Sequence, residues 1–125
     1  MIEYKVTVNG NGSRSWFLND KLHREDGPAI ERINGCGNWF LNGKLHREDG
    51  PAITHADGYE AWYLNGKRHR EDGPAVEYAH GDSAWYLNGQ QLTEAEFSER
   101  MNLMVEMTVA ELGKKLNIKN LKIVK

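Results

Sequence analysis

The chain has no apolar run long enough to cross a membrane. A helix that spans a bilayer needs about 20 consecutive apolar residues, and charged or polar residues interrupt every stretch of this 125-residue sequence before that length. The opening residues, 1–4, show neither the basic segment nor the apolar segment of a secretory signal. We therefore expect a cytoplasmic protein with no membrane partner.

Cysteine is nearly absent, and so is any excess of charge of one sign. Cys36 is the single cysteine, which excludes an internal disulfide and fits a reducing compartment. Sixteen Lys and Arg against eighteen Asp and Glu leave a formal net charge of −2. Proteins that bind nucleic acid usually carry a basic patch or stripe, so the charge weighs against nucleic acid as a partner.

The usual signatures of catalysis and cofactor binding are missing as well. The sequence contains no Gly-x-Ser-x-Gly, no Cys-x-x-Cys and no His-Glu-x-x-His. The glycine-rich segment 9–13 lacks the Gly-Lys-Ser/Thr ending and the following helix of a phosphate-binding loop. We expect a protein that is not an enzyme, with no catalytic residues, no bound cofactor and no metal.

What the sequence has instead is a repeat of 23 residues. The stretch 62–76 occurs almost unchanged at 16–30 and 39–53, and its first half recurs at 85–89. The tryptophans recur at the same interval: Trp16, Trp39, Trp62 and Trp85. Because identical segments fold alike, the repeat predicts a series of equivalent structural units.

Each unit contains two turn signals. One is the glycine at positions 12, 35, 58 and 81, and the other follows the asparagine at positions 19, 42, 65 and 88. Asn-Gly and Asp-Gly pairs supply the positive φ angles of hairpin turns. The runs between the turns are short and rich in aromatic and β-branched residues. Two turns predict two strands per unit, with Trp39 and Leu41 on one face and Phe40 on the other.

The two ends of the chain depart from the repeat. Residues 5–8 predict a strand that pairs with the first Trp strand. After Gly89, Thr93 with Glu96 forms a capping box that predicts a helix at about 94–101. A second capping box at Thr108 predicts another helix start, and alternation over 120–124 predicts a strand. We interpret this region as a cap over the sheet, with a separate binding module as the alternative.

The repeat resembles the MORN repeat. Lys67-Arg68-His69 after Asn65-Gly66, and Ala56-Asp57-Gly58 before the next aromatic strand, are the matching segments. Arg-Glu-Asp-Gly-Pro replaces the usual glycines after the histidine, as in a "WYLNGK-HREDGPA" variant in small proteins of bacteriophages and large DNA viruses. The tail from Met107 is also similar to a C-terminal module of tailed-phage proteins. The resemblance implies scaffolding or binding surfaces.

The resulting fold prediction is mainly β with α at the C-terminus. Residues 1–92 would form a single twisted antiparallel sheet of successive MORN-like hairpins, with about 7–8 strands. Residues 93–125 would cap it with one or two short helices and a strand. The unpaired edge at residues 5–8 predicts a homodimer, formed through that edge or through the tyrosine face.

His-Arg-Glu-Asp occurs three times, beginning at His23, His46 and His69. Two strands per unit place equivalent residues roughly 10 Å apart, so these histidines cannot share a zinc ion with ligand bonds of about 2 Å. We interpret the segment as structural: Arg pairs with Glu or Asp, Asp-Gly-Pro turns, and His packs or bonds to the backbone. A partner-binding ridge is the alternative.

Positions where the copies differ are the better binding candidates, because the scaffold does not dictate them. They include the aligned row of Arg32, His55 and Tyr78, and the residues at the turn tips. Cys36 is one of the turn residues, and we interpret it as having no role as a nucleophile. The tryptophan row is predicted to be core, and so is the Phe/Tyr row, although tyrosine also suits an exposed recognition surface. The candidate partner-binding residues are Arg32, His55, Tyr78, Tyr59, Tyr63 and Tyr86.

These observations lead to one main functional hypothesis and two alternatives. The main one is a non-enzymatic phage accessory protein that binds a host or phage protein through a rigid β-surface, in counter-defence or host takeover. The first alternative is a nucleic-acid or nucleotide-binding module that uses Tyr63, Tyr86 and the lysine-rich tail. The second is a structural or assembly scaffold.

Overall fold

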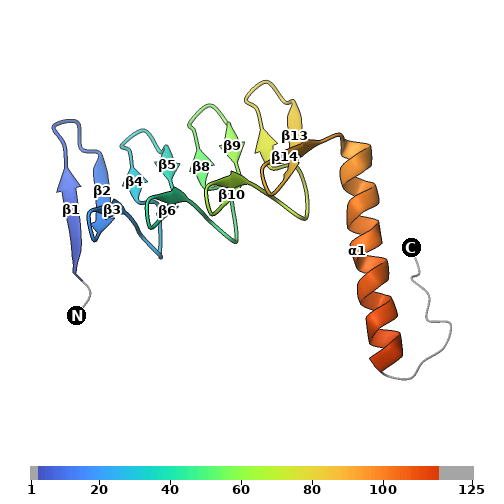
Figure 1. Cartoon of the computed structure of the whole chain (residues 1–125). Helices are drawn as coiled ribbons and strands as arrows, with labels where there is room; N and C mark the ends of the chain where they lie inside the picture. The colour runs from blue at the N-terminus through green and yellow to red at the C-terminus, as the bar shows by residue number, and fades with distance from the viewer. Residues whose placement is uncertain (1–2, 116–125) are drawn as a thin grey trace. The chain divides into compact units, whose positions relative to one another are not determined.

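The computed structural model describes residues 3–115 and shows one large open antiparallel sheet, two small two-stranded sheets and one helix (Figure 1). The strands of the large sheet lie in the order β1-β2-β4-β5-β8-β9-β12-β13-β14, with β3 paired to β2. β6 pairs with β7 and β10 with β11 in two-stranded sheets. The predicted fold class, a mainly β protein with an open antiparallel sheet and a C-terminal helix, is confirmed.

The strands are short, and most contain two residues. Their bounds are β1 Tyr4–Val8, β2 Arg14–Leu18, β3 Lys21–Leu22, β4 Ile30–Glu31, β5 Gly37–Asn38, β6 Phe40–Leu41, β7 Lys44–Leu45, β8 Ile53–Thr54, β9 Glu60–Ala61, β10 Tyr63–Leu64, β11 Lys67–Arg68, β12 Val76–Glu77, β13 Ser83–Leu87 and β14 Gln90–Leu92. Contacts divide the chain into two units, Met1–Gln91 and Leu92–Lys125. The repeats lie in the first unit and the helix in the second.

Each repeat forms two hairpins rather than one. In the third repeat, β8 and β9 form the first hairpin and β10 and β11 form the second. The return strand β11 departs from the prediction of two strands per unit. Asn65 and Gly66 both have positive φ, 50° and 80°, as a two-residue type I′ turn requires. Such a turn sends the chain straight back along the strand it has left, so the next residues pair with it.

The first turn of each repeat is a three-residue loop. In the third repeat, the amide of His55 donates to the carbonyl of Tyr59 at 2.9 Å, and Gly58 has a φ of 99°. The Asp57 carboxylate accepts the Tyr59 amide at 3.0 Å. Gly12, Gly35 and Gly81 also have positive φ, so the predicted turns are confirmed.

Backbone and histidine hydrogen bonds join each repeat to the next. The amide of Gly66 donates to the carbonyl of Leu45 at 2.8 Å, and the amide of Asn65 donates to Nδ1 of His46 at 2.9 Å. The same histidine bond recurs from Asn42 to His23 and from Asn88 to His69, each at 2.9 Å. The interpretation of these histidines as structural groups that bond to the backbone is confirmed.

The buried core is thin and consists mainly of small side chains. Ala29, Ala52, Ala61, Ala75 and Val76 have no exposed surface. The tryptophans, which the sequence predicts to be core, are only half-buried. In a single-layer sheet, the loops between repeats have to cover this face. They do so with arginine, whose Cζ lies 4.0 Å from the ring centre in three pairs: Arg24–Trp16, Arg47–Trp39 and Arg70–Trp62.

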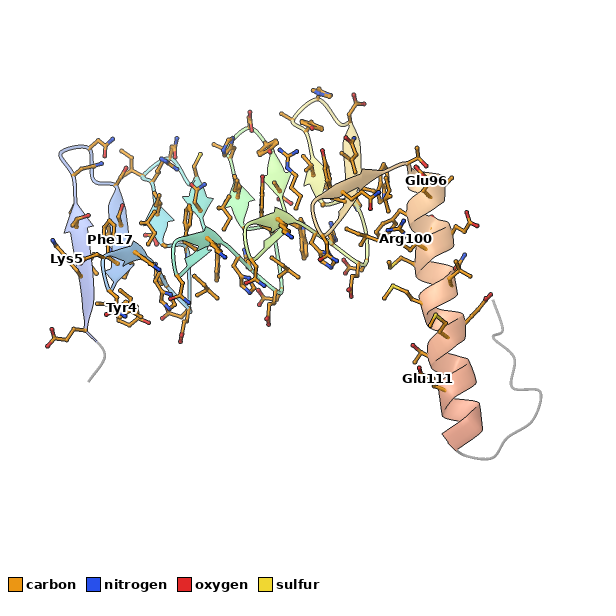
Figure 2. The ribbon with its side chains drawn as sticks, in the orientation of Figure 1. Tyr4, Lys5, Phe17, Glu96, Arg100 and Glu111 are labelled. Carbon is orange, nitrogen blue, oxygen red and sulfur yellow. The ribbon has the colours of Figure 1, made fainter. Side chains whose placement is uncertain are left out.

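The strand at the N-terminal end of the sheet, β1, pairs with β2 as predicted. Lys5 lies opposite Phe17, and Tyr4 lies opposite Leu18 (Figure 2). β1 comes first in the strand order and all five of its residues are exposed. Its outer edge is therefore open among the described residues, and the homodimer remains a prediction.

The helix α1 runs from Glu94 to Lys115 in one piece. Its predicted start is confirmed, because Thr93 Oγ1 accepts the Glu96 amide at 3.1 Å and Glu96 accepts the Thr93 amide at 2.9 Å. The second predicted helix start is wrong. The Thr108 hydroxyl donates a hydrogen bond to the carbonyl of Met104 at 3.0 Å. A threonine that bonds to the carbonyl four residues earlier lies inside a helix and not at its start. The strand predicted at 120–124 lies outside the described residues.

Glu96, in the first turn of α1 (Figure 2), should make the stability of this turn depend on pH. The Glu96 carboxylate accepts a hydrogen bond from the Thr93 backbone amide, and this bond, with a smaller effect of the Thr93 side chain, lowers the pKa of the Glu96 carboxyl. A pKa that is lower in the folded chain stabilises the helix start above the unfolded value of about 4.3. That stabilisation disappears as the pH falls through the folded pKa.

An NMR titration checks this prediction. The Glu96 carboxyl should titrate below its ordinary value, and exchange of the Thr93 amide should accelerate on acidification. In Glu96→Gln, which keeps an acceptor but does not titrate, this pH dependence should vanish. A titration midpoint at or above about 4.3 would contradict the prediction.

Candidate functional site

The register of the sheet defines one face on which the candidate residues meet. Val76 lies opposite both Ala61 and Ala84, and Ala61 also lies opposite Ile53. Directly opposed residues share a face. Tyr59, Tyr63 and Tyr86 pack against this cluster. We call this side of the sheet the recognition face.

An aromatic row crosses the turn end of the recognition face. The rings of His55 and Tyr59 have centres 4.9 Å apart, and those of Tyr59 and Tyr78 are 5.9 Å apart. Tyr78 and His80 are stacked, with centres 5.4 Å apart and an angle of 3° between the planes. Tyr78 is 36% exposed, so the row presents ring surface to solvent while its members support one another.

Arg32 continues this row into the neighbouring repeat. Its Nη1 donates to Oδ1 of Asn38 at 2.8 Å, which holds the guanidinium on the recognition face. A shallow cleft of about 440 Å³ lies beside it. The residues that line the cleft are Arg32, Cys36, Asn38, His55, Ala56 and Asp57. Sγ of Cys36 accepts the amide of Ala56 at 3.3 Å, so this thiol has a structural contact.

Tyr63 and Tyr86 form a second cluster at the other end of the strands. Arg68 lies between them and donates to both hydroxyls at 3.1 Å. Its Cζ lies 6.0 Å from the Tyr63 ring centre and 5.1 Å from that of Tyr86. Partial burial disfavours the charged guanidinium, but the bonds to Tyr63 and Tyr86 outweigh burial and raise the pKa of Arg68. This cation is fixed rather than free to rotate.

All the predicted partner-binding residues thus lie on one face, in two clusters. Two residues of the same face were missed, His80 and Arg68. His80 occupies a turn row that otherwise holds Asn or Asp, and Arg68 replaces a leucine of the other copies, Leu22 and Leu45. The rule that variable positions mark the binding surface would have found both if it had been applied to every row.

The His-Arg-Glu-Asp segments hold the scaffold together. Arg24 pairs with Asp26 at 3.0 Å and with Glu31 of the next strand at 3.2 Å. Arg70 donates to Asp72 at 2.7 Å, and this bond lowers the pKa of the Asp72 carboxyl. Within residues 3–115, no three His, Cys, Asp or Glu side chains converge in a way that would hold a metal ion.

Between residues 3 and 115, no helix combines the length and the apolar character needed to cross a bilayer.

No protein-family model, no curated protein and no solved structure matches this chain.

Proposed function

We propose that this chain is a non-enzymatic binding protein that holds a protein partner on its recognition face. One observation carries the proposal: the six predicted partner-binding residues, which occupy positions where the repeats differ, lie together on one side of the sheet. The invariant residues of the repeat make turns, backbone bonds and ion pairs. The variable ones are left to determine what the surface contacts.

The chemistry of these residues suits a protein partner. Tyrosine, arginine and tryptophan dominate the binding energy of protein interfaces. Tyrosine also buries a large area at a small cost in side-chain entropy. On this face, Arg68 is held by two tyrosine hydroxyls and Arg32 by Asn38. A pre-organised surface loses less entropy on binding than a flexible one.

The likeness of the repeat to those of small phage proteins supports the biological setting. We place the protein as a phage accessory factor whose partner is a host or phage protein, with counter-defence or host takeover as its role. The absence of catalytic motifs from the sequence supports a binding rather than a catalytic role.

A capture experiment tests this function. Tagged full-length protein, incubated with lysate of infected host cells, should retain one dominant protein. The double variant Tyr59→Ala/Tyr78→Ala should retain at least tenfold less of it, since hot-spot tyrosines each contribute about 1–2 kcal/mol. Leu103→Ala, which removes an exposed apolar side chain from α1, serves as the control and should retain the full amount.

Two outcomes would favour the alternatives over this function. The stacked Tyr78 and His80 rings could accept a nucleobase, and salt-dependent retention on single-stranded DNA or RNA would then replace protein capture. Recovery of the protein within purified phage particles, with no captured partner, would indicate an assembly scaffold.

A further inference from the structure

The side of the sheet opposite the recognition face carries a row of three similar clefts. Their volumes are about 390, 380 and 340 Å³. The first is lined by Tyr4, Val6, Trp16, Arg24, Glu25 and Asp26. The second and third each have a tryptophan, a leucine and a histidine, with Arg-Glu-Asp from one repeat and Arg-Glu from the repeat before it. The clefts therefore recur with the sequence repeat.

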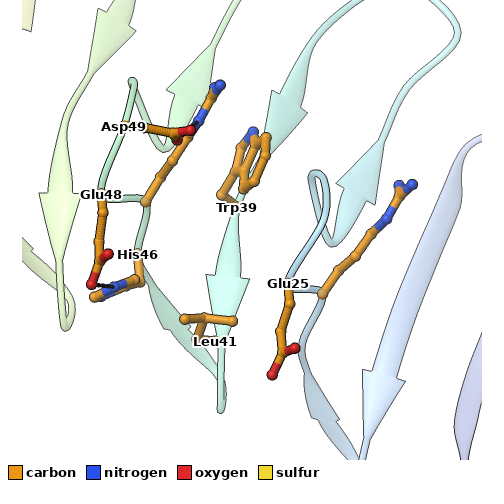
Figure 3. Close-up of a pocket in the computed structure, with 8 residues that line it drawn as sticks. Glu25, Trp39, Leu41, His46, Glu48 and Asp49 are labelled. Carbon is orange, nitrogen blue, oxygen red and sulfur yellow. Dashed lines mark hydrogen bonds and ion pairs between the residues drawn. The ribbon is translucent and has the colours of Figure 1, made fainter.

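The second cleft shows the composition most clearly. Figure 3 shows Trp39 and Leu41 between the loop that carries Glu25 and the loop that carries His46 and Glu48. Both apolar residues project away from the recognition face, because side chains alternate along a strand. The cleft thus has an indole and an isobutyl group at its base, and polar groups at its rim.

The arginine of each loop is held by contacts within its own repeat. Arg47 lies 4.0 Å from the Trp39 ring centre, and donates to Asp49 at 3.2 Å and to the Pro51 carbonyl at 3.2 Å. The glutamate is different. Glu48 is 84% exposed and faces Nε2 of His46 at 3.7 Å. Glu25 and Glu71 are placed alike, 75% and 64% exposed. The outward charge of every loop is therefore a carboxylate.

An apolar base beneath an exposed carboxylate suits a side chain with an apolar stem and a cationic head. Lysine and arginine have this form, and they commonly bury the stem while the charge stays in water. The charge of the clefts is complementary to such a side chain. A free anion or an acidic segment would instead be repelled.

The spacing of the clefts selects the backbone that presents these side chains. Successive clefts are separated by two strands of the sheet, which is about 9.6 Å. A polyproline II helix repeats every three residues, or about 9.3 Å. An α-helix brings a residue back to one face after seven residues, or about 10.5 Å. Over two intervals the mismatch is about 0.6 Å for polyproline II and about 1.8 Å for the α-helix.

We infer that this face binds an extended, polyproline II segment that carries lysine or arginine at every third residue, one basic side chain in each cleft. The interaction is separate from the recognition face and does not depend on its function. Proline between the basic residues keeps the segment extended before it binds, which lowers the entropy lost on binding.

The probe is a fluorescein-labelled peptide of three Pro-Pro-Lys triplets, titrated with the full-length protein and followed by fluorescence anisotropy. Binding should saturate and should weaken as salt is added. Glu25→Gln, Glu48→Gln and Glu71→Gln should each weaken binding about threefold, and the triple variant about 30-fold. Glu99→Gln, which removes the same charge from an exposed position on α1, should bind like the parent protein.

Control peptides test the spacing. A peptide with the same six prolines and three adjacent lysines should bind about tenfold more weakly, because its lysines cannot reach three clefts at once. The inference is overturned if this peptide binds equally well, if a helical peptide with lysine at every seventh residue binds more tightly, or if the triple variant binds unchanged. Circular dichroism of the triple variant should match that of the parent, since all three carboxylates are exposed.

Discussion

Trp62→Ala is expected to lower the free energy of unfolding by about 3 kcal/mol. Trp62 lies beneath the guanidinium of Arg70 at 4.0 Å. Its amide donates to the carbonyl of Ala75 at 2.7 Å, and Ala75 is fully buried. The backbone bond remains in the variant, but the half-buried indole is lost and Arg70 is left without its ring. Urea denaturation followed by far-ultraviolet circular dichroism measures the loss.

Trp85→Ala is the matched control for this prediction. The same side chain is removed, but the last repeat lacks the His-Arg-Glu-Asp segment. Among the described residues, no arginine lies over the Trp85 ring. The loss should be smaller than for Trp62→Ala by about 1 kcal/mol, the usual contribution of a partly shielded cation–π contact. Equal losses would show that the stacked arginine contributes nothing to stability.

Gly50→Ala should destabilise the protein by about 2 kcal/mol. A Cβ added at Gly50 would lie 2.7 Å from Cζ of Arg47 and 2.9 Å from its Nε. Gly50 is not among the glycines with positive φ, so alanine can adopt its backbone conformation. The cost arises because the new methyl group displaces Arg47 from the Trp39 ring. Denaturation in urea measures the effect.

Two further variants separate this mechanism from a general effect of alanine. At Gly10, an added Cβ would have nothing within 4 Å, so Gly10→Ala should be close to neutral. If the steric clash with Arg47 is the cause, Gly50→Ala should cost much less in an Arg47→Ala background. Additive losses in the double variant would refute the proposed packing of glycine, arginine and tryptophan.

These glycines also show why part of the structure was not predictable from the sequence. In Asp-Gly-Pro, the sequence predicts that the glycine is a turn residue. Gly27, Gly50 and Gly73 instead provide room for an arginine side chain three residues earlier. A glycine needed for space and a glycine needed for positive φ look identical in a sequence. Only the position of the arginine over the tryptophan distinguishes the two.

The tryptophans illustrate a related limit. Their aromatic size and regular spacing predict a core, and the structure leaves all four half-buried, three of them beneath arginine. Burial depends on whether a second layer covers the sheet, and the alternation of residues along a strand carries no information about a second layer. The second capping box failed for a similar reason. Thr108 and Glu111 have the residue types and spacing of a capping box, but they follow a segment that is already helical.

The sequence by itself determined the period of the repeat, the turns, the pairing of the first strand and the start of the helix. Each depends on local backbone geometry, such as positive φ at Asn65 and Gly66 or the reciprocal bonds of Thr93 and Glu96. It also identified the variable positions, because exact repeats make each departure visible.

The tertiary structure alone decided which of these positions touch. The aromatic row from His55 to His80 and the cluster of Tyr63, Arg68 and Tyr86 join residues from different repeats. Their contacts depend on the strand register and on side-chain rotamers, which act across the sheet rather than along the chain. Those contacts turn a list of variable residues into one surface with a defined shape and charge.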